Sequence, residues 1–525
     1  MELTPSTFTM HDPLSQFSDR RAALKAVFGV LGGLLGTSCT SLSVAQASVR
    51  VPTNSTADTW RILSRWGYGP NRTLAQKLMN VGDAHAWGVQ QIEAAWLASQ
   101  SPPYMPADLA SFNAPLSQLF EGAQQERKAR TTIQPGERNP DESSALRRFD
   151  FSGTSDPLAF SRTKVQQAAA WRLDINRQPQ VEPPLLARMT EFWFNHLNIY
   201  AGKGAVRPFA GHYVVNVARA HAMGKFEDLL LASARHPAML LYLDQAQSVA
   251  DGSRGANGST RGLNENYARE LMELHTLGVS GGYTQRDVRE LARVLTGWTV
   301  GPNQSSGFRF AERLHDGGKK ELLGRAFPAS PGEAGEPEGE QAIRMLARHP
   351  RTAQRISLRL AQFFVSDTPS PALVQHLADV FLRTQGDTRQ MLRAILDSAD
   401  FWNPNHRLFK TPMDFACSAL VATHSQNREA TDRRDLLATM GFLAQAGQPL
   451  HGWQTPDGYR TDAATWLAPE ALTRRADFAL NVARQAEDLD FLLPFLSATT
   501  RATIAQERPP LRAGLMLASP DFMYK

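Results

Sequence analysis

The sequence predicts an all-α fold, a large multi-helix globular fold with a minor β-hairpin. From about residue 56 onwards, apolar residues recur with helical spacing rather than with the alternation of strands. Most of these periodic segments end at glycine or proline, which interrupt helices. Alternation is confined to a short stretch around Phe308 and Phe310, followed by turn residues at 316–318. We therefore expect one small hairpin with His315 at its tip.

The helical segments can be placed in chain order from their periodicity and their stop signals. The expected helices cover residues 56–80 with a break at 67–70, and then residues 84–100, 161–174, 184–196, 226–234, 236–246, 341–364 and 371–401. His236-Pro237 and His349-Pro350 each precede a helix, because proline fits the first helical turn. Residues 262–298 form two further helices joined by a Gly-Gly turn.

Segments rich in Gly, Pro and polar residues predict the loops. They lie at residues 132–157, 250–261, 328–340 and 448–465. The expected organisation is one large helical domain over residues 48–525. An alternative division has two lobes, 56–300 and 341–525, with the hairpin and loop segment 301–340 between them.

Composition excludes some functional classes. Apolar residues make up 42% of the 525-residue chain and charged residues 20%, which is typical of folded globular proteins. The formal net charge is +5, and the basic residues are spread along the chain beside acids. We therefore expect no nucleic-acid binding. No apolar run is long enough to predict a transmembrane span.

The N-terminus predicts export. Arg20-Arg21 precede a short apolar run at residues 26–35, and Ala45-Gln46-Ala47 offers a small-residue cleavage site. This is the pattern of a signal peptide over residues 1–47, and the paired arginines fit the twin-arginine type. We expect a periplasmic or secreted protein after cleavage near Ala47. The alternative is a lipid anchor at Cys39.

Cleavage at that site leaves a single cysteine, Cys417, which cannot form an intrachain disulfide. Its apolar helical surroundings predict a small buried side chain. The mature protein then depends on its hydrophobic core for stability.

The densest polar signal lies in the first helix of residues 262–298. Five polar residues fall within a sector of roughly 140° at about 100° per residue. They are Glu265, Asn266, Arg269, Glu270 and Glu273. Glu265, Arg269 and Glu273 could form an exposed salt-bridge ladder, because each acid lies one turn from the arginine. The alternative is a polar site facing a cleft, which explains Asn266 and Glu270 better, since Glu270 has no cation one turn away.

Two kinds of chemistry are open for such a cleft. The three glutamates could perform acid–base chemistry, with Arg269 holding one of them ionised. A metal site is also conceivable, although Arg269 would compete with a cation for the carboxylates. His196 and His315 are weaker candidate site residues. His275 points away from Glu270 and is expected to be a hydrogen-bonded core histidine. Sequence motifs for serine hydrolases, zinc proteases and nucleotide binding are absent.

Two residues of the second helix have structural interpretations. Thr284 followed by Asp287 is close to a capping box, so Thr284 is expected to begin the helix. Trp298 follows a glycine that ends the helix, and it is expected in the core.

Residues 263–279 (LNENYARELMELHTLGV), with Gly282-Tyr283-Thr284-Gln285 and residues 295–298 (LTGW), closely resemble the bacterial domain-of-unknown-function 1800 family. Further pieces fit the same family in order. They are residues 65–70 (RWGYGP), Phe192-Trp193 with Asn195-His196, Tyr242-Leu243-Asp244, His315-Asp316 with Lys319, His349-Pro350, residues 409–412 (FKTP) and residues 518–522 (ASPDF). The resemblance covers nearly everything from about residue 56 to the C-terminus.

This resemblance implies an exported helical protein and no agreed activity. Members are often paired with exported proteins of the domain-of-unknown-function 1501 family, which are similar to sulfatases and alkaline phosphatases. A partner of that family is therefore implied, but no catalytic residue is transferred.

Two functional hypotheses follow. In the first, the five polar residues line a cleft of a hydrolase-like or accessory protein that acts on envelope or extracellular polymers with an exported partner. His196, Asp244 and His315 are then candidate contributors. In the second, the protein is a non-catalytic helical scaffold or binding module for a sulfatase-like exported partner. Burial discriminates them, because a cleft predicts that Glu270 and Asn266 open into a pocket and gather a His or Asp.

Overall fold

The structure is a computed structural model that describes residues 55–132, 157–253, 262–424, 433–484, 486 and 488–525. The predicted signal peptide, including Cys39, and nearly all of the polar loop 132–157 lie outside the described residues. Most of the Gly- and Ser-rich segment 250–261 does so too. Predictions that concern these segments stay predictions.

Helices dominate the described residues, as the periodicity predicted. Up to residue 294 they are α2 (Thr56–Arg65), α3 (Arg72–Val81), α4 (Ala84–Ser99), α5 (Leu116–Thr132), α6 (Phe160–Asn176), α7 (Pro184–His196), α8 (Ala210–Tyr213), α9 (Phe226–Arg235), α10 (Pro237–Tyr242), α11 (Asn266–Glu270) and α12 (Gln285–Val294). Later helices are α13 (Gly335–Ala347), α14 (Pro350–Phe364), α15 (Pro371–Thr384), α16 (Thr388–Asp397), α17 (Ala399–Trp402), α18 (Pro412–Thr423), α19 (Arg434–Gln445), α20 (Ala463–Trp466), α21 (Pro469–Ala483), α22 (Ala498–Ala505), α23 (Pro509–Ala518) and α24 (Pro520–Met523).

Short irregular helices connect these elements. Two are π-helical, η5 (Val214–Arg219) and η7 (Leu271–His275). The 3-10 turns are η1 (Ala110–Asn113), η3 (Pro157–Ala159), η4 (Arg207–Phe209), η6 (Gln245–Gln247), η8 (Glu312–Leu314), η9 (Gly332–Ala334) and η10 (Asp490–Phe495).

Proline sets the start of many of these helices. Its fixed φ suits the first turn, and its missing N–H is one that a helix leaves unpaired there anyway. The prolines in this position include Pro184, Pro237, Pro350, Pro371, Pro412, Pro469, Pro509 and Pro520. His236 and His349 cap α10 and α14 by accepting a backbone N–H at Nδ1, which confirms both as helix entries.

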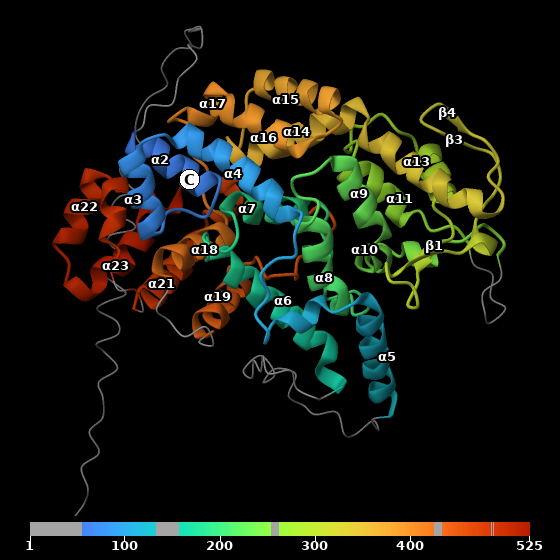
Figure 1. Cartoon of the computed structure of the whole chain (residues 1–525), viewed down its shortest axis with the longest axis horizontal. Coiled ribbons are helices and arrows are strands. Elements are labelled where there is room, and N and C mark those ends of the chain that lie inside the picture. The colour runs from blue at the N-terminus through green and yellow to red at the C-terminus, as the bar shows by residue number, and fades with distance from the viewer. Residues whose placement is uncertain (1–54, 133–156, 254–261, 425–432, 485, 487) are drawn as a thin grey trace, which may run out of the picture.

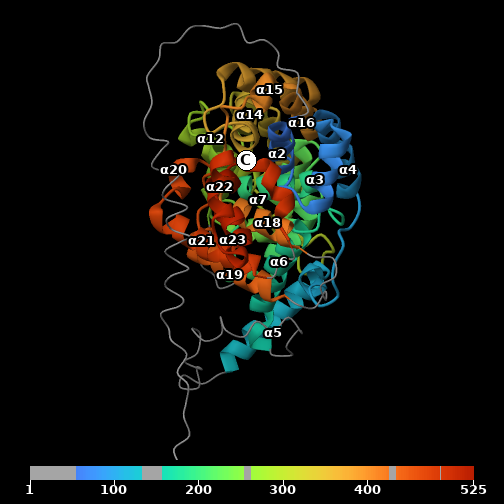
Figure 2. The ribbon, with the colours of Figure 1, turned by 90° about the vertical axis from the view of Figure 1, so that its left-hand side faces the viewer.

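Helices α7 and α18 form the centre of the molecule. Eleven of the thirteen residues of α7 and eleven of the twelve of α18 are buried. Figure 2 shows both helices in the middle, with α14, α15 and α16 on one side and α5 projecting on the other. A single hydrophobic cluster reaches from Ile62 in α2 to Met523 in α24. Whether the chain is best divided into two lobes stays a prediction.

Charged residues lie inside this core. Arg188 of α7 pairs with Asp414 of α18, and Asp414 also pairs with Lys525. Arg172 pairs with Glu191 at 2.5 Å, and Trp60 donates to the backbone oxygen of Tyr524 at 3.2 Å. The C-terminal residues therefore lie against α2, as Figure 1 shows. Cys417 is a buried free thiol in α18, as predicted.

The β structure differs in detail from the prediction. Strands β1 (Trp298–Val300) and β2 (Phe308–Phe310) form one antiparallel hairpin, and β3 (Lys320–Leu322) and β4 (Arg325–Phe327) form a second. His315 lies between the two hairpins, so its expected place at a hairpin tip is wrong. The second hairpin turns at Leu323 and Gly324, both with positive φ, a signal that the sequence analysis missed.

The expected loop 328–340 is also partly wrong, because α13 already begins at Gly335. Its high Gly and Pro content suggested a loop, yet Pro337 lies in the first turn of α13, and Gly335 and Gly339 of this helix face aromatic rings. A Cβ at Gly335 would lie 2.4 Å from the His315 ring, and a Cβ at Gly339 would lie 2.5 Å from the Trp298 indole. Close packing against these rings requires glycine at both positions. Trp298 itself is fully buried, as predicted.

Candidate functional site

The segment with the five polar candidates changes its helix type in the middle. Residues 266–270 form the α-helix α11, and residues 271–275 continue as the π-helix η7. A π-helix bonds residue i to i+5 and therefore holds more residues per turn than an α-helix. The expected sector at about 100° per residue fails after Glu270 for this reason. Such π-helical segments are frequent at functional sites.

Three of the candidates lie on the surface. Arg269 Nη2 lies 3.4 Å from Glu265 Oε2, and Gln285 bridges the pair with bonds of 2.9 Å to Arg269 and 2.5 Å to Glu265. Asn266 is exposed and donates to the backbone oxygen of Leu243 at 3.2 Å. The expected ladder is thus half formed, since Glu273 makes no ion pair with Arg269. An exposed pair of this kind contributes about 0–1 kcal/mol.

Glu270 and Glu273 face a different environment. Glu273 accepts a hydrogen bond of 3.3 Å from the Tyr283 hydroxyl. Glu270 is half-buried, and no hydrogen bond or ion pair reaches its carboxyl from the described residues. Burial raises the pKa of Glu270, and the negative charges of Glu273 and Asp457 raise it further, while Arg269 opposes them. This carboxyl therefore takes up a proton more readily than an ordinary glutamate.

Helix α14 brings two arginines to the same region. Arg355 donates from Nε to the backbone oxygen of Leu274 at 2.9 Å, at the end of the π-helix. Burial and the neighbouring charge of Arg359 lower the pKa of Arg355 to about 10. Burial also lowers the pKa of Arg359, against the influence of Asp457 and Tyr459. Arg359 makes no hydrogen bond or ion pair within the described part of the chain.

Asp457 is carried by a loop that the end of α7 holds in place. The Asn195 amide pairs with both backbone groups of Tyr459, at 3.0 and 2.8 Å. Asn198 donates to the backbone oxygen of Thr455 at 2.8 Å. Gly458 has φ +70°, and a Cβ there would lie 2.2 Å from the Asn195 oxygen, so only glycine fits. The loop after α19 is therefore fixed against α7.

Tyr242 joins this loop to the motif. Its hydroxyl donates to the backbone oxygen of Gln454 at 2.7 Å. The Tyr242 pKa is raised first by burial and then by the charges of Glu270 and Asp457. Segments far apart in the sequence thus meet at the motif: α10 and the 448–459 loop near Glu270, and α14 at Leu274.

We call the group of Glu270, Glu273, Arg355, Arg359 and Asp457 the Glu270 site. Sequence reasoning found its two glutamates and missed the other three residues. The missed signal was the spacing of Arg355 and Arg359, because like charges at i and i+4 destabilise a helix unless something else favours them.

His196 and His275 lie buried behind this site. His196 Nε2 lies 3.0 Å from the backbone oxygen of His275, so Nε2 carries the hydrogen and donates. Burial lowers the pKa of both rings, that of His275 to about 3, so both are neutral near pH 7. His275 is a core residue as expected, but neither ring nitrogen has a hydrogen-bond partner among the described residues. The expectation of a hydrogen-bonded ring is wrong.

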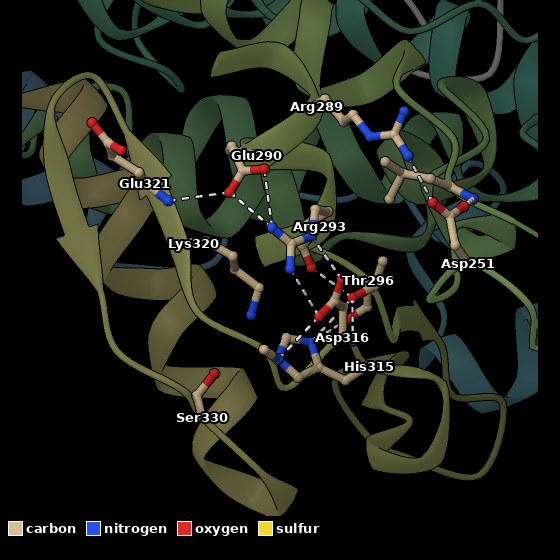
Figure 3. A network of polar contacts seen from close by, with 12 residues as sticks. Asp251, Arg289, Glu290, Arg293, Thr296, His315, Asp316, Lys320, Glu321 and Ser330 are labelled. Atoms are coloured by element: carbon tan, nitrogen blue, oxygen red, sulfur yellow. Dashed lines mark hydrogen bonds and ion pairs between the residues drawn. The ribbon is translucent and has the colours of Figure 1, made fainter. Parts of the chain in front are cut away.

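His315 belongs to a separate, closed network, shown in Figure 3. Its Nδ1 lies 2.9 Å from the backbone oxygen of Thr296, and its Nε2 lies 3.2 Å from Glu338 Oε2. Lys320 and Ser330 donate to the same carboxylate oxygen at 2.7 and 2.9 Å. The side chains of His315, Lys320 and Glu338 are at most 5% exposed. The network therefore fastens β3 to α13 and presents no surface to a large ligand.

Polar contacts of Arg293, labelled in the centre of Figure 3, and of other residues nearby in the sequence also support the fold. Arg293 donates to Asp316 at 2.7 Å and to Glu290 at 2.9 Å. Thr284 and Asp287 form the complete capping box of α12. Asp244, the third weaker candidate, pairs with Lys203 at 2.6 Å.

The five polar candidates line neither of two hollows elsewhere in the molecule. A cavity of about 20 Å³ next to Glu191, His451 and Tyr459 has room for about one water. An open groove of about 1490 Å³ runs between α5, residues 204–209 and residues 300–303. Within the described ranges, no group of three or more His, Cys, Asp or Glu side chains is placed to hold a metal ion. Nor does any described helix combine the length and apolar character needed to cross a membrane.

Comparison with known proteins places the chain in a family. No curated protein and no solved structure matches it. The family described as "Protein of unknown function (DUF1800)" matches residues 61–524. This range is nearly the whole chain and includes all residues of the Glu270 site. The chain therefore belongs to the DUF1800 family.

Proposed function

We propose that the protein is an exported, hydrolase-like protein that acts on an envelope or extracellular polymer and uses Glu270 as its proton-transferring group. The observation that carries this proposal is the pair of unpartnered groups in one site. Glu270 and Arg359 carry opposite charges, and within the described residues neither makes a hydrogen bond or an ion pair. Structural charges in a protein interior are normally paired. Two half-buried groups of opposite charge that pair neither with each other nor with another described residue suit a bound ligand.

The raised pKa of Glu270 gives this site its chemistry. In hydrolysis a protonated carboxyl can donate its proton to the oxygen of the departing group as that bond breaks. A second carboxylate accepts a proton from the water that attacks. Glu273 and Asp457 are the carboxylates whose charges reach Glu270, so they are the candidates for this second role. Two carboxyls with different environments are a common basis of such acid–base pairs.

The location rests on the sequence of the first 47 residues. The Arg20-Arg21 pair, the apolar run and the Ala45-Gln46-Ala47 site support export by the twin-arginine route. Lipid attachment at Cys39 is the alternative outcome of processing. We further propose an exported partner of the domain-of-unknown-function 1501 family.

The test compares two glutamates of the same motif. A deletion strain is complemented with wild-type protein, Glu270→Gln or the matched control Glu265→Gln, which alters only the exposed network. Export and thermal melting of each variant are measured in parallel. We expect Glu270→Gln to fold, to be exported and to fail in complementation, whereas Glu265→Gln complements. Full complementation by Glu270→Gln would refute the proposed role.

One observation favours a second candidate, a non-catalytic binding module for the exported partner. Glu265, Asn266 and Arg269 lie at the surface, where a partner protein could contact them. This candidate predicts the reverse pattern. Glu265→Gln combined with Arg269→Gln would then abolish recovery of the partner with the tagged protein, and Glu270→Gln would leave it intact.

A further inference from the structure

Arg359 is half-buried, and it differs from the buried arginines of this protein in what surrounds its guanidinium. Arg172, Arg188 and Arg219 each pair with a carboxylate, namely Glu191, Asp414 and Glu182. A second group lacks such a pair but donates to backbone carbonyls. Arg65 donates to the oxygen of Phe364 at 3.1 Å, and Arg475 donates to that of Lys410 at 2.8 Å.

Arg359 has neither kind of partner among the described residues. The neighbouring Arg355 adds a second positive charge close to Arg359, which destabilises this part of the helix further. Arg355 lies one turn earlier on the same face of α14, and the positive charge of Arg359 lowers the pKa of Arg355. Two like charges at this spacing, both partly buried, destabilise the helix.

The nearby acids do not neutralise this pair directly. Glu273 and Asp457 lie near enough to influence Arg355 and Arg359, respectively, but no ion pair within 4.0 Å joins them. The Glu273 carboxylate instead accepts from Tyr283, and the Asp457 carboxylate accepts from Thr455 at 2.5 Å. The histidines behind the site, His196 and His275, are neutral and add no counter-charge.

Within the described residues, Arg355 donates a hydrogen bond only from its Nε atom. Its Nε caps the carbonyl of Leu274, and its Nη1 lies close to Gly278, where a Cβ would be 3.3 Å away. Gly278 has φ +89°, which favours glycine. Among the described residues, no hydrogen bond or ion pair uses the two terminal nitrogens of Arg355, so they can join those of Arg359 in binding.

We propose that Arg355 and Arg359 form a subsite for an oxyanion, a carboxylate, sulfate or phosphate group carried by the polymer that the protein acts on. Planar guanidinium groups bind such oxyanions with paired hydrogen bonds. Glu273 influences both Glu270 and Arg355, and Asp457 influences both Glu270 and Arg359, so the subsite lies in the same region as the Glu270 carboxyl. An anionic residue of the polymer held by the arginines would then bring a neighbouring linkage towards that carboxyl. This inference rests on the proposed function for the polymer and for its cleavage, but anion binding itself can be measured separately.

The first experiment uses inorganic sulfate and the mature protein. Thermal melting and titration calorimetry are recorded in sodium sulfate and in sodium chloride of equal ionic strength. Four proteins are compared: wild type, Arg359→Gln, Arg351→Gln and Glu270→Gln. Arg351 is the matched control, because it is an exposed arginine of the same helix. Melting without sulfate shows that each variant folds, and loss of a half-buried cation that has no partner among the described residues should not lower the Tm of Arg359→Gln.

We expect sulfate to raise the Tm of wild type, Arg351→Gln and Glu270→Gln, and to leave that of Arg359→Gln unchanged. Affinity for sulfate should fall roughly tenfold to a hundredfold in Arg359→Gln, as for the loss of a charge-assisted hydrogen bond. No specific sulfate effect in wild type, or an equal effect in Arg359→Gln, would overturn the subsite.

A second arm separates a polymer from a free anion. A heparin-derived hexasaccharide, which carries sulfate and carboxylate groups, should bind wild type and Arg351→Gln more tightly than sulfate does, and bind Arg359→Gln more weakly. Binding of sulfate without the hexasaccharide would overturn the assignment to a polymer. Because Glu270→Gln should bind sulfate normally, sulfate binding together with full complementation by this variant would reject the proposed catalysis and leave the anion subsite in place.

Discussion

Acidification should destabilise this protein strongly, because several histidines are buried in their neutral form. Burial lowers the pKa of His196, His212, His236, His275 and His451, that of His212 to about 4 and that of His275 to about 3. In the unfolded chain these five rings take up protons near the ordinary value of 6.5. The unfolded state therefore binds more protons below pH 6.5, and stability must rise with pH across this window.

The His212 and His236 rings illustrate the cause. His236 Nδ1 accepts from the backbone N–H of Ala238 at 3.1 Å, so His236 Nε2 carries the hydrogen. This Nε2 donates to His212 Nδ1 at 3.0 Å, which must be unprotonated. A proton on either ring would bring two N–H groups face to face, or would remove the cap of α10.

The magnitude follows from linkage. Between about pH 7.5 and about pH 5.5, each histidine that stays neutral in the folded state costs about 1.4 kcal/mol of stability, so five cost about 7 kcal/mol. Carboxyls with a raised pKa, such as Glu182 and Glu270, act in the opposite direction and offset part of this loss. The remaining loss is still a large fraction of the stability of a typical protein, about 5–15 kcal/mol.

Urea unfolding at several pH values between these limits tests this prediction. The free energy of unfolding should fall steeply with acidification, with a slope that corresponds to uptake of several protons. His275→Leu should reduce the slope by about one proton, because it removes one ring that stays neutral in the folded state. A free energy that is independent of pH over this range would refute the reasoning.

Two other predictions concern a buried network and export. Glu338→Gln leaves the buried Lys320 ammonium without its carboxylate, so it should lower the free energy of unfolding by about 3–5 kcal/mol, and adding Lys320→Met should recover much of the loss. An equal loss in the single and the double variant, measured by urea unfolding, would contradict this account. Replacing both Arg20 and Arg21 by lysine should leave the protein in the cytoplasm upon cell fractionation, and normal periplasmic delivery would disprove the twin-arginine assignment.

Local sequence rules located most of the helices. The breaks at Gly67-Tyr68-Gly69-Pro70 and the starts at Pro184 and Pro350 act through the backbone of neighbouring residues, so a sequence pattern reveals them. The same rules failed for α13. Gly335 and Gly339 lie there because the His315 and Trp298 rings pack against the helix, which is a tertiary constraint.

In the candidate site, too, local sequence patterns revealed some residues, and tertiary packing determines the others. Glu270 and Glu273 could be selected from one dense motif. Asp457, Arg355 and Arg359 come from segments that only the packing of α7, α14 and the 448–459 loop brings to that motif. The π-helix also escaped prediction, because regular helical spacing was assumed for all five polar residues.

Titration of the Glu270 carboxyl tests the central claim most directly. Carbon NMR of the mature protein with ¹³C-labelled glutamate side chains would follow each carboxyl, and Glu270→Gln would identify the signal that belongs to Glu270. The account predicts a midpoint above the ordinary value of 4.5, because the carboxyl is half-buried, unpaired and close to two other acids. A midpoint at or below 4.5 would show a paired or solvated carboxylate and would contradict the proposed role in proton transfer.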